Sequence, residues 1–499
     1  MRAKVHAGGL LGVEAFPVTV EVLLGKGLPS FELVGLPERG VKESRVRVRA
    51  ALESCGAALP ARPLVVNLAP GDLRKTGSSF DLAIALGIVV ASGLAPFDRL
   101  SDLLVLGELG LGGELRAVPG VLPHLRAAAR RGLRRAIVPE ASVTEAALAD
   151  GVEVYVAAHL RDAVAYLRGE ASLPRAIERV SEAKCEASAE GVDLADVRGQ
   201  ETARRALEIA AAGKHNLLFV GSPGAGKTML ARRLPTILPR PTPAEALEIA
   251  TVRSAAGLEM PPRLELLSRP FRAPHSSASA SALVGGGDPV RPGEVTLAHG
   301  GVLFLDELPE FRRDALESLR QTMEDGVVSV ARVGHRVTMP AAPLVVAAMN
   351  PCPCGWEGDR KRECGACPVK AERYRARVSG PLLDRFDMQV PVERIEPRDL
   401  RRVEPGESSE KVRARVVAAR ELLEREGPRD LESIERRVDP RAMAILDRAV
   451  ERFALSARAY GKVLRVSDTI AALSGQRALR ESHVAEALHY RMFDRARVA

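Results

Sequence analysis

The segment HNLLFVGSPGAGKTMLARRL, residues 215–234, decides the fold of the middle of the chain. Its apolar run LLFV predicts a buried strand, and MLARRL predicts a helix. Between them, GSPGAGKT matches the phosphate-binding pattern G-x-x-x-x-G-K-[ST] at the strand-to-helix junction where that pattern acts. Strands and helices alternate on either side, which is typical of a parallel α/β sheet. The segment therefore predicts a nucleotide-binding site at the edge of such a sheet.

The residues of this loop have separate expected roles. Lys227 is expected to reach the β- and γ-phosphates of ATP, and the Thr228 hydroxyl to ligate Mg²⁺. Backbone N–H groups freed by the glycines surround the phosphates, helped by the dipole of the following helix. A plain glycine turn is the alternative. The other candidate nucleotide-binding residues are Gly221, Ser222, Pro223, Gly224, Ala225, Gly226 and Met229.

A second apolar strand, GGVLFLDE, ends in the acids Asp306 and Glu307. Parallel strands end at one edge of their sheet, so Asp306 is expected to hold Mg²⁺ through water. Glu307 is expected to orient or deprotonate the attacking water. The alternative is an acidic pair that only caps the strand. Binding alone needs only Asp306, and the second acid therefore favours hydrolysis.

Three further polar residues are candidates for the same site. Asn350 ends a third buried strand, PLVVAAMN, and is expected near the γ-phosphate if that strand lies between the other two. Arg385, in SGPLLDRFDM, and Arg458, in LSARAYGKVLRV, stand in helical stretches. Strand-ending asparagines and surface arginines are common, so a structural role stays open for each.

The chain is expected to form three units. Residues 1–172 alternate strands and helices and predict a separate α/β domain, with strands near 16–25, 62–70 and 147–158 and helices near 40–56 and 79–93. A helix behind the Asp193 cap is expected over 193–213. The expected division is a first domain at 1–172, a polar linker at 173–193, the nucleotide-binding core at 194–396 with a Cys-rich insert at 352–367, and an all-helical domain at 397–499.

The segment VVSVARVGHRVTMP, residues 327–340, alternates apolar and polar residues around a glycine and predicts a hairpin. Arg332, His335 and Arg336 near its tip are candidate contacts to a DNA backbone. A solvated tip is the equal alternative. The formal charge of +8, from 72 basic and 64 acidic residues, permits a nucleic-acid partner without establishing one.

Four cysteines follow the spacing C-x-C-x9-C-x2-C: Cys352, Cys354, Cys364 and Cys367. Four thiolates at these spacings can close a tetrahedral, structural Zn²⁺ site, and free reduced thiols are the alternative. Clustered cysteines indicate metal or redox chemistry in a chain without a secretion signal. The longest uncharged apolar run, residues 82–95, is shorter than the roughly 20 residues needed to cross a bilayer. No membrane contact and a cytoplasmic location are expected.

Several blocks together resemble the ComM/YifB family of magnesium-chelatase-like AAA+ ATPases: DVRGQ, GSPGAGKT, RPFRAPH, LVGGG, RPGEVTLAHGGVLFLDELPEF, AAMNPCPCG and SGPLLDRFD. The resemblance covers nearly the whole chain. It implies a central AAA+ P-loop ATPase and a C-terminal helical lid. It also implies that Asn350 is sensor 1, Arg385 an arginine finger acting on a neighbouring subunit, and Arg458 sensor 2.

The same resemblance implies a function. Its members are expected to form ATP-bound homohexameric rings and to act as helicases on single-stranded or branched DNA, promoting branch migration during natural transformation. A chelatase-like or protein-remodelling ATPase without DNA motor activity is the alternative.

The N-terminal segment KTGSSFDLAIALGIV resembles the serine-bearing helix start of Lon-type proteases, with their ribosomal S5 domain 2-like fold. The resemblance places Ser79 at the nucleophile. The position expected for the lysine base falls at Leu122, and no lysine occurs between residues 76 and 183. Because a serine hydroxyl needs a base, the domain is expected to be non-proteolytic.

Overall fold

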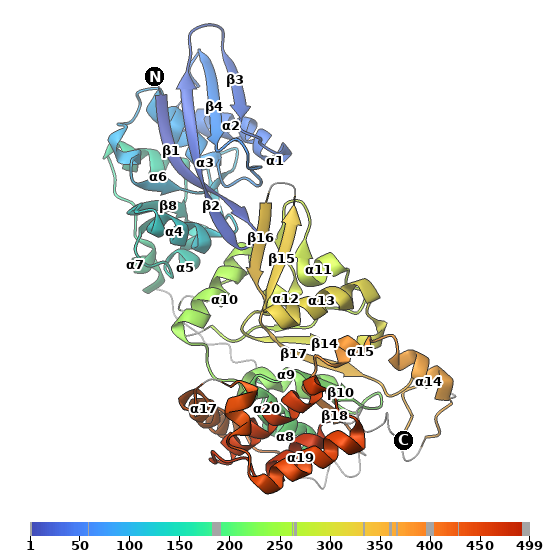
Figure 1. The fold of residues 1–499 in the computed structure, drawn as a ribbon. Helices are drawn as coiled ribbons and strands as arrows, with labels where there is room; N and C mark the ends of the chain where they lie inside the picture. The colour runs from blue at the N-terminus through green and yellow to red at the C-terminus, as the bar shows by residue number, and fades with distance from the viewer. Residues whose placement is uncertain are drawn as a thin grey trace.

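The structure is a computed structural model, and three parts of the chain follow one another along it (Figure 1). The N-terminal strands lie at the top of the view, a second sheet in the middle, and the C-terminal helices at the bottom. No helix in the described part of the chain is both long and apolar enough to cross a bilayer. The structure describes residues 2–57, 59–181, 191–261, 263, 267–332, 335–358, 362–365, 368–395, 404–427 and 429–491.

The central sheet is parallel, as the sequence predicts, and its five strands run in the order β11-β14-β17-β10-β18. Every residue of β10, β14 and β17 is buried, because helices cover both faces and uninterrupted apolar runs are needed there. The strands β10, β14 and β17 are neighbours, so their carboxyl ends meet at one edge. Their bounds are β10 (Leu217–Val220), β11 (Phe271–Arg272), β14 (Val302–Leu305), β17 (Leu344–Met349) and β18 (Met388–Pro391).

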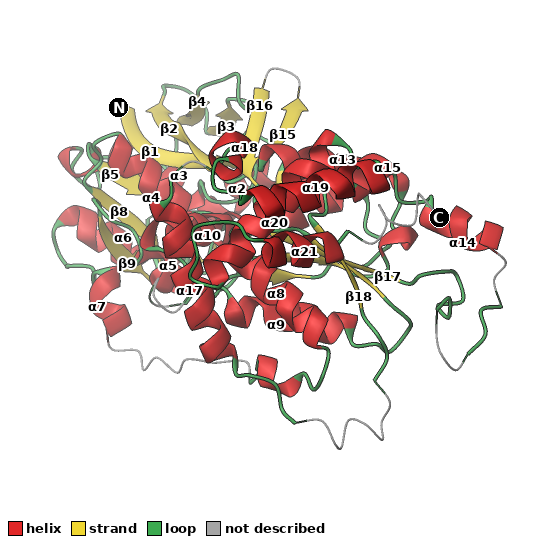
Figure 2. Ribbon diagram, turned by 60° about the horizontal axis from the view of Figure 1, so that its bottom comes forward, coloured by secondary structure: helices red, strands yellow, loops and turns green. Residues whose placement is uncertain are grey.

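Helices from the two ends of this region share the core on one face of the sheet (Figure 1, Figure 2). They are α8 (Glu201–Gly213), α9 (Lys227–Ile237), α17 (Ser409–Arg425), α18 (Leu431–Glu435), α19 (Pro440–Phe453), α20 (Ala457–Leu473) and α21 (Glu481–His489). The other face packs on α10 (Pro243–Ala255), α11 (Ala280–Val284), α12 (Glu294–Leu297), α13 (Arg313–Asp325) and α15 (Gly380–Leu383). The described chain after residue 404 is mainly helical, as expected.

The helix predicted to start at Asp193 begins later, so this prediction is wrong in its N-terminal bound. Asp193 caps only a short 3-10 turn, Leu194–Asp196, by accepting a 2.7 Å hydrogen bond from the Ala195 N–H. Gln200 then adopts φ +54°, a left-handed conformation that cannot belong to an α-helix, and α8 starts at Glu201.

The N-terminal part contains a seven-stranded mixed sheet in the order β3-β4-β2-β1-β5-β8-β9. Helix α3 (Asp81–Ala91) packs on β1 and β2, and all of its residues are buried. The strands are β1 (Arg2–Leu11), β2 (Glu14–Leu24), β3 (Ser30–Val34), β4 (Pro63–Ala69), β5 (Leu103–Val105), β8 (Arg135–Pro139) and β9 (Glu153–Ala157). The other helices are α1 (Arg39–Lys42), α2 (Ser44–Ser54), α4 (Val121–Arg130), α5 (Val143–Ala146) and α6 (Leu160–Arg168).

This N-terminal layer continues past residue 172, into the segment expected as a linker. Helix α7 (Ala176–Ser181) comes directly after Arg175, which forms an ion pair of 3.0 Å with Glu153 of β9. Ala176 is buried in the N-terminal core. The segment 182–190 lies outside the described residues.

Among the contacts that dock the N-terminal and central parts, two involve apolar residues of both parts. Helices α4 and α10 meet in an apolar cluster that includes Leu122 and Ile249, and the Leu122 N–H donates to Ser254 Oγ at 3.2 Å. The β1–β2 turn inserts Val13 into the core of the central part, beside Val337 of the predicted hairpin. That hairpin is confirmed as β15 (Val327–Arg332) and β16 (His335–Pro340), and it lies beside the β1–β2 turn (Figure 1).

Candidate nucleotide and metal sites

The glycine loop connects β10 to α9 in a backbone shape that only glycine adopts easily. Gly224 and Gly226 have φ values of +75° and +93°, in the left-handed region. A Cβ at Gly221 would overlap the carbonyl oxygen of Val392, which follows the neighbouring strand β18. Helix α9 begins at Lys227, and its N-cap residue, Gly226, provides no side-chain cap. Its N-terminal N–H groups therefore face the loop, as a phosphate-binding turn requires.

Lys227 holds its ammonium group over this loop. The residue is only 8% exposed, and Nζ donates to the carbonyl oxygens of Gly221 and Ser222 at 2.5 and 3.1 Å. It also donates to Asn350 Oδ1 at 3.0 Å. Burial lowers the pKa of Lys227 from its usual value, against the charge of Asp306. A phosphate oxygen can replace these neutral acceptors and gain a charged partner.

Thr228 and Asp306 meet beside the lysine. The Thr228 hydroxyl donates to Asp306 Oδ2 at 2.7 Å, joining the start of α9 to the end of β14. The Glu307 N–H donates to Asp306 Oδ1 at 3.0 Å, while Glu307 itself is exposed with φ +53°. A hydroxyl and a carboxylate at this spacing, next to a lysine, fit the oxygen ligands of a magnesium–nucleotide complex.

The structure therefore brings together Lys227, Thr228, Asp306 and Asn350, which the sequence predicts to share one site. The two candidate arginines, Arg385 and Arg458, have other surroundings. Arg385 follows α15, is 10% exposed in its side chain, and forms an ion pair with Glu324 of α13. Arg458 is exposed in the first turn of α20. Within the described residues, neither arginine forms a hydrogen bond or ion pair with the four site residues.

Two supporting residues were missed by the sequence analysis. Gln200 Nε2 donates to the carbonyl oxygens of Ala225 and Glu393, at 3.1 and 2.5 Å, and so links the glycine loop to the chain after β18. Lys462 of α20 donates to the Phe386 carbonyl oxygen at 3.2 Å, next to Arg385. Gln200 belongs to the block DVRGQ, and Lys462 is a lysine in a chain where arginine predominates. The block DVRGQ and the scarcity of lysine could therefore have pointed to both residues in the sequence.

The three basic residues proposed to contact DNA, Arg332, His335 and Arg336, belong to the strands of the hairpin. Arg332 and His335 face each other in the backbone register at the end of the hairpin, and their side chains are outside the described set. Arg336 is exposed, and Nη2 donates to Ser329 Oγ at 3.4 Å. A cationic side chain is thus presented on the hairpin surface.

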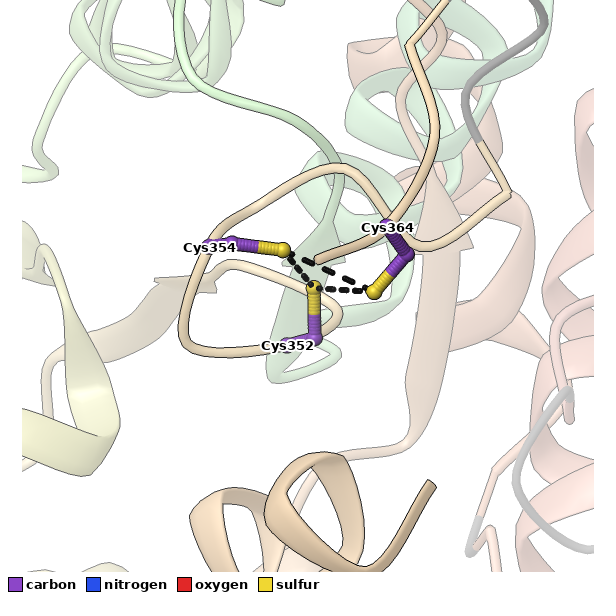
Figure 3. Close-up of side chains that lie close together, drawn as sticks. All are labelled: Cys352, Cys354 and Cys364. Atoms are coloured by element: carbon purple, nitrogen blue, oxygen red, sulfur yellow. Dashed lines mark hydrogen bonds between the residues drawn. The ribbon is translucent and has the colours of Figure 1, made fainter. Parts of the chain in front are cut away.

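Three of the four clustered cysteines converge (Figure 3). The Sγ atoms of Cys352, Cys354 and Cys364 lie 3.2, 3.6 and 3.5 Å apart, and the Glu357 N–H donates to Cys352 Sγ at 3.3 Å. Tetrahedral zinc with Zn–S bonds of about 2.3 Å separates its sulfur ligands by about 3.8 Å. The group can therefore hold a metal ion. Cys367 lies outside the described residues.

Ser79 lines a cavity of about 930 Å³ between the N-terminal and central parts. Its hydroxyl donates to the Gly8 carbonyl oxygen at 3.4 Å, a backbone group that cannot act as a base. The nearest preceding lysine in the sequence, Lys75, is buried and donates to the Leu73 carbonyl oxygen at 2.8 Å.

Comparison with known proteins covers most of the chain. Three family models match: "Magnesium chelatase, subunit ChlI" over residues 193–400, "Subunit ChlI of Mg-chelatase" over 20–142, and "Magnesium chelatase, subunit ChlI C-terminal" over 406–491.

Individual relatives agree with these models. Competence protein ComM of Haemophilus influenzae is 44% identical over 499 residues, covering 98% of this chain and 97% of the relative. YifB of Escherichia coli is 42% identical over 500 residues, with the same coverage of 98% and 97%. DNA repair protein RadA of Escherichia coli is 32% identical over 153 residues, covering 30% of this chain and 32% of RadA. The full-length matches show that the chain belongs to the ComM/YifB family of magnesium-chelatase-like proteins.

Proposed function

We propose that this protein is an ATP-hydrolysing motor that moves on DNA and promotes branch migration during recombination. The ATPase part rests on one observation: Lys227, Thr228, Asp306 and Asn350 meet at the carboxyl edge of a parallel sheet. The DNA part is supported by the basic hairpin, by the competence role in the name of ComM, and by the DNA repair role in the name of RadA.

The residues divide the chemistry of hydrolysis between them. Thr228 and Asp306 would hold the Mg²⁺ of the nucleotide, and Lys227 would exchange its carbonyl acceptors for the β- and γ-phosphates. When bound, the metal would supply positive charge that neutralises the phosphate oxygens. Glu307, exposed directly after Asp306, accepts a proton from the attacking water. Asn350 orients that water or the γ-phosphate through its amide.

Arg385 and Arg458 complete the site in an assembly. A hexameric ring presents Arg385 to the ATP of the neighbouring subunit, where its charge stabilises the transition state. In a single chain Glu324 holds this guanidinium, so assembly exchanges one anionic partner for another. Arg458 lies at the start of α20, and we assign it to the chain's own nucleotide as sensor 2.

The remaining parts support this motor. We propose that Cys352, Cys354 and Cys364 bind structural Zn²⁺, and that the described helices after residue 404 act as a lid over the nucleotide. The N-terminal part has a Lon-protease-like, S5-type fold without proteolytic activity, because Ser79 donates to a backbone carbonyl. The proposed location is the cytoplasm.

The test is ATP hydrolysis with and without single-stranded and branched DNA. Wild type is compared with Lys227→Ala and with the control Lys411→Ala, an exposed lysine of α17. We expect hydrolysis that rises severalfold with DNA, disappears in Lys227→Ala and persists in the control. Hydrolysis indifferent to every DNA would instead favour a chelatase-like or protein-remodelling ATPase.

A further inference from the structure

The cysteine cluster begins where the nucleotide site ends. Strand β17 is followed by Asn350, which accepts the hydrogen bond from Lys227, and Cys352 comes two residues later. Cys352 is fully buried. Cys352 and Asn350 therefore lie on the same short stretch of backbone directly after β17.

The turn after Cys352 touches the glycine loop itself. The Gly355 N–H donates to the Cys352 carbonyl oxygen at 3.0 Å and closes the turn. Gly355 has φ +83°, and a Cβ on it would lie 2.5 Å from Pro223 Cδ. Backbone and proline ring are thus so close that no side chain fits between them. The backbone of the cysteine turn therefore lies directly against Pro223 of the phosphate-binding loop.

A third contact fixes the root of the turn. Arg375, the last residue of α14 (Pro368–Arg375), donates to the Pro351 carbonyl oxygen at 3.3 Å and to Glu357 Oε2 at 2.8 Å. The turn is therefore held between α14 on one side and the glycine loop on the other. Cys364 Sγ, close to Cys352 Sγ and Cys354 Sγ, and Arg362, which lies over the Trp356 ring, join the later part of the insert to this turn.

The three sulfur atoms need a cation to stay together as thiolates. At separations of 3.2–3.6 Å, three negative charges repel one another, and a soft divalent metal converts that repulsion into three bonds. The Glu357 N–H also donates to Cys352 Sγ, which fixes the position of that sulfur. One bound ion would therefore join Cys364 to the turn that contacts Pro223.

We propose that a soft divalent metal bound by Cys352, Cys354 and Cys364 sets the position of Pro223 and Asn350, so that ATP hydrolysis depends on a metal other than the magnesium of the nucleotide. The inference rests on the proposed ATPase and on the proposed zinc site. It adds a regulatory consequence to them: a chelator or an oxidant that empties the thiolate site lowers turnover.

The test uses three variants of the full chain. Cys364→Ser removes a ligand far from Asn350 in the sequence. Gly355→Ala keeps every thiol but forces a methyl group against Pro223. Cys55→Ser is the matched control, since Cys55 lies in the N-terminal part, with its sulfur 3.9 Å from His159 Nδ1. Each protein is purified without added metal and assayed for zinc content, cobalt–thiolate absorption after Co²⁺ exchange, fluorescent ATP-analogue affinity and turnover.

We expect wild type and Cys55→Ser to bind about one zinc per chain, and Cys364→Ser to bind less than about 0.2, without the cobalt–thiolate band. Turnover should fall roughly tenfold or more in Cys364→Ser, because small misplacements of catalytic groups are costly. Gly355→Ala should retain zinc and the cobalt band but lose turnover to a similar extent.

Each alternative result has a distinct meaning. Loss of zinc in Cys364→Ser with unchanged turnover would overturn the coupling and leave the zinc site standing. Wild type without zinc or a cobalt–thiolate band would overturn the zinc site and the coupling with it. Full turnover in Gly355→Ala would overturn the route through Pro223. Turnover absent from wild type itself would overturn the proposed ATPase.

Discussion

Lys227 Nζ and Asn350 Oδ1 are joined by a 3.0 Å hydrogen bond across 123 positions of sequence. The bond ties the phosphate-binding lysine of α9 to the end of the neighbouring strand β17. It places the amide of Asn350 at the point where Lys227 is expected to meet a γ-phosphate. The asparagine is therefore positioned to affect the chemical step more than the binding of nucleotide.

Substitution of Asn350 should separate binding from turnover. In Asn350→Ala the lysine keeps its two carbonyl acceptors, so the affinity for an ATP analogue should change less than about threefold, whereas turnover should fall about 10- to 100-fold. Fluorescent-analogue titration and phosphate release measure the two quantities. A loss of affinity as large as the loss of turnover would show that Asn350 mainly supports Lys227.

Glu307→Gln should bind ATP and fail to hydrolyse it. The amide cannot accept the proton of the attacking water, so turnover should fall by about 100-fold or more while the Thr228–Asp306 pair is retained. Retained ATP can be quantified after rapid gel filtration. Glu310→Gln, which changes an exposed acid paired with Arg377, is the matched control. Near-normal turnover in Glu307→Gln would assign the base to another residue.

A mixture of two inactive variants should recover activity if Arg385 acts in trans. Arg385→Ala retains a nucleotide pocket, and Lys227→Ala retains the arginine, so a mixed ring contains some complete interfaces. ATP hydrolysis by each variant and by the mixture measures this directly. Mixed oligomers that form, as judged by pull-down of differently tagged chains, but remain inactive would rule out an arginine supplied by a neighbour.

The hairpin should contribute charge to DNA binding. Arg336→Ala removes one exposed cation, so single-stranded DNA affinity should fall at every sequence tested and the salt dependence should lose about one unit of slope. Fluorescence anisotropy across a salt series measures both. The exposed Arg49 of α2 serves as the control in Arg49→Ala. An unchanged slope in Arg336→Ala would identify the hairpin as a solvated tip.

Stability should fall between about pH 6.5 and pH 4 because of His215. Burial lowers the pKa of His215 from 6.5 to about 4, and its Nε2 lies 2.8 Å from Thr469 Oγ1 of α20. The unfolded state takes up the proton first as pH decreases, so the free energy of unfolding decreases through this window. Urea unfolding at several pH values should show a shallower decline for His215→Gln than for wild type. Equal declines of the unfolding free energy in the two proteins would show that His215 does not cause the loss of stability.

The sequence predicted the parts of the site that local patterns determine. The apolar runs of β10, β14 and β17 each end in a residue of the site, and the glycine pattern identifies Lys227 and Thr228 without tertiary information. Such segments are short, fully buried and flanked by their functional residues. The apolar pattern that predicts the strand therefore also locates the functional residue beside it.

The missed features depend on contacts between distant segments. The ion pair between Arg385 and Glu324, and the hydrogen bond from Gln200 to Ala225, leave no periodic signal in either partner. Strand β1 was not predicted, since the pair Gly8–Gly9 weakens its strand pattern while its pairing with β2 stabilises it. The late start of α8 follows from the left-handed backbone at Gln200, which composition does not indicate.

We propose above that ATP hydrolysis at the Lys227 site drives movement on DNA. The most direct test is ATP-dependent conversion of a labelled synthetic four-way junction, with wild type, Lys227→Ala and the control Lys411→Ala. We expect wild type and Lys411→Ala to convert the junction into duplex products only with hydrolysable ATP, and Lys227→Ala to leave it intact. Wild type that hydrolyses ATP at full rate on every DNA and converts none would contradict the claim.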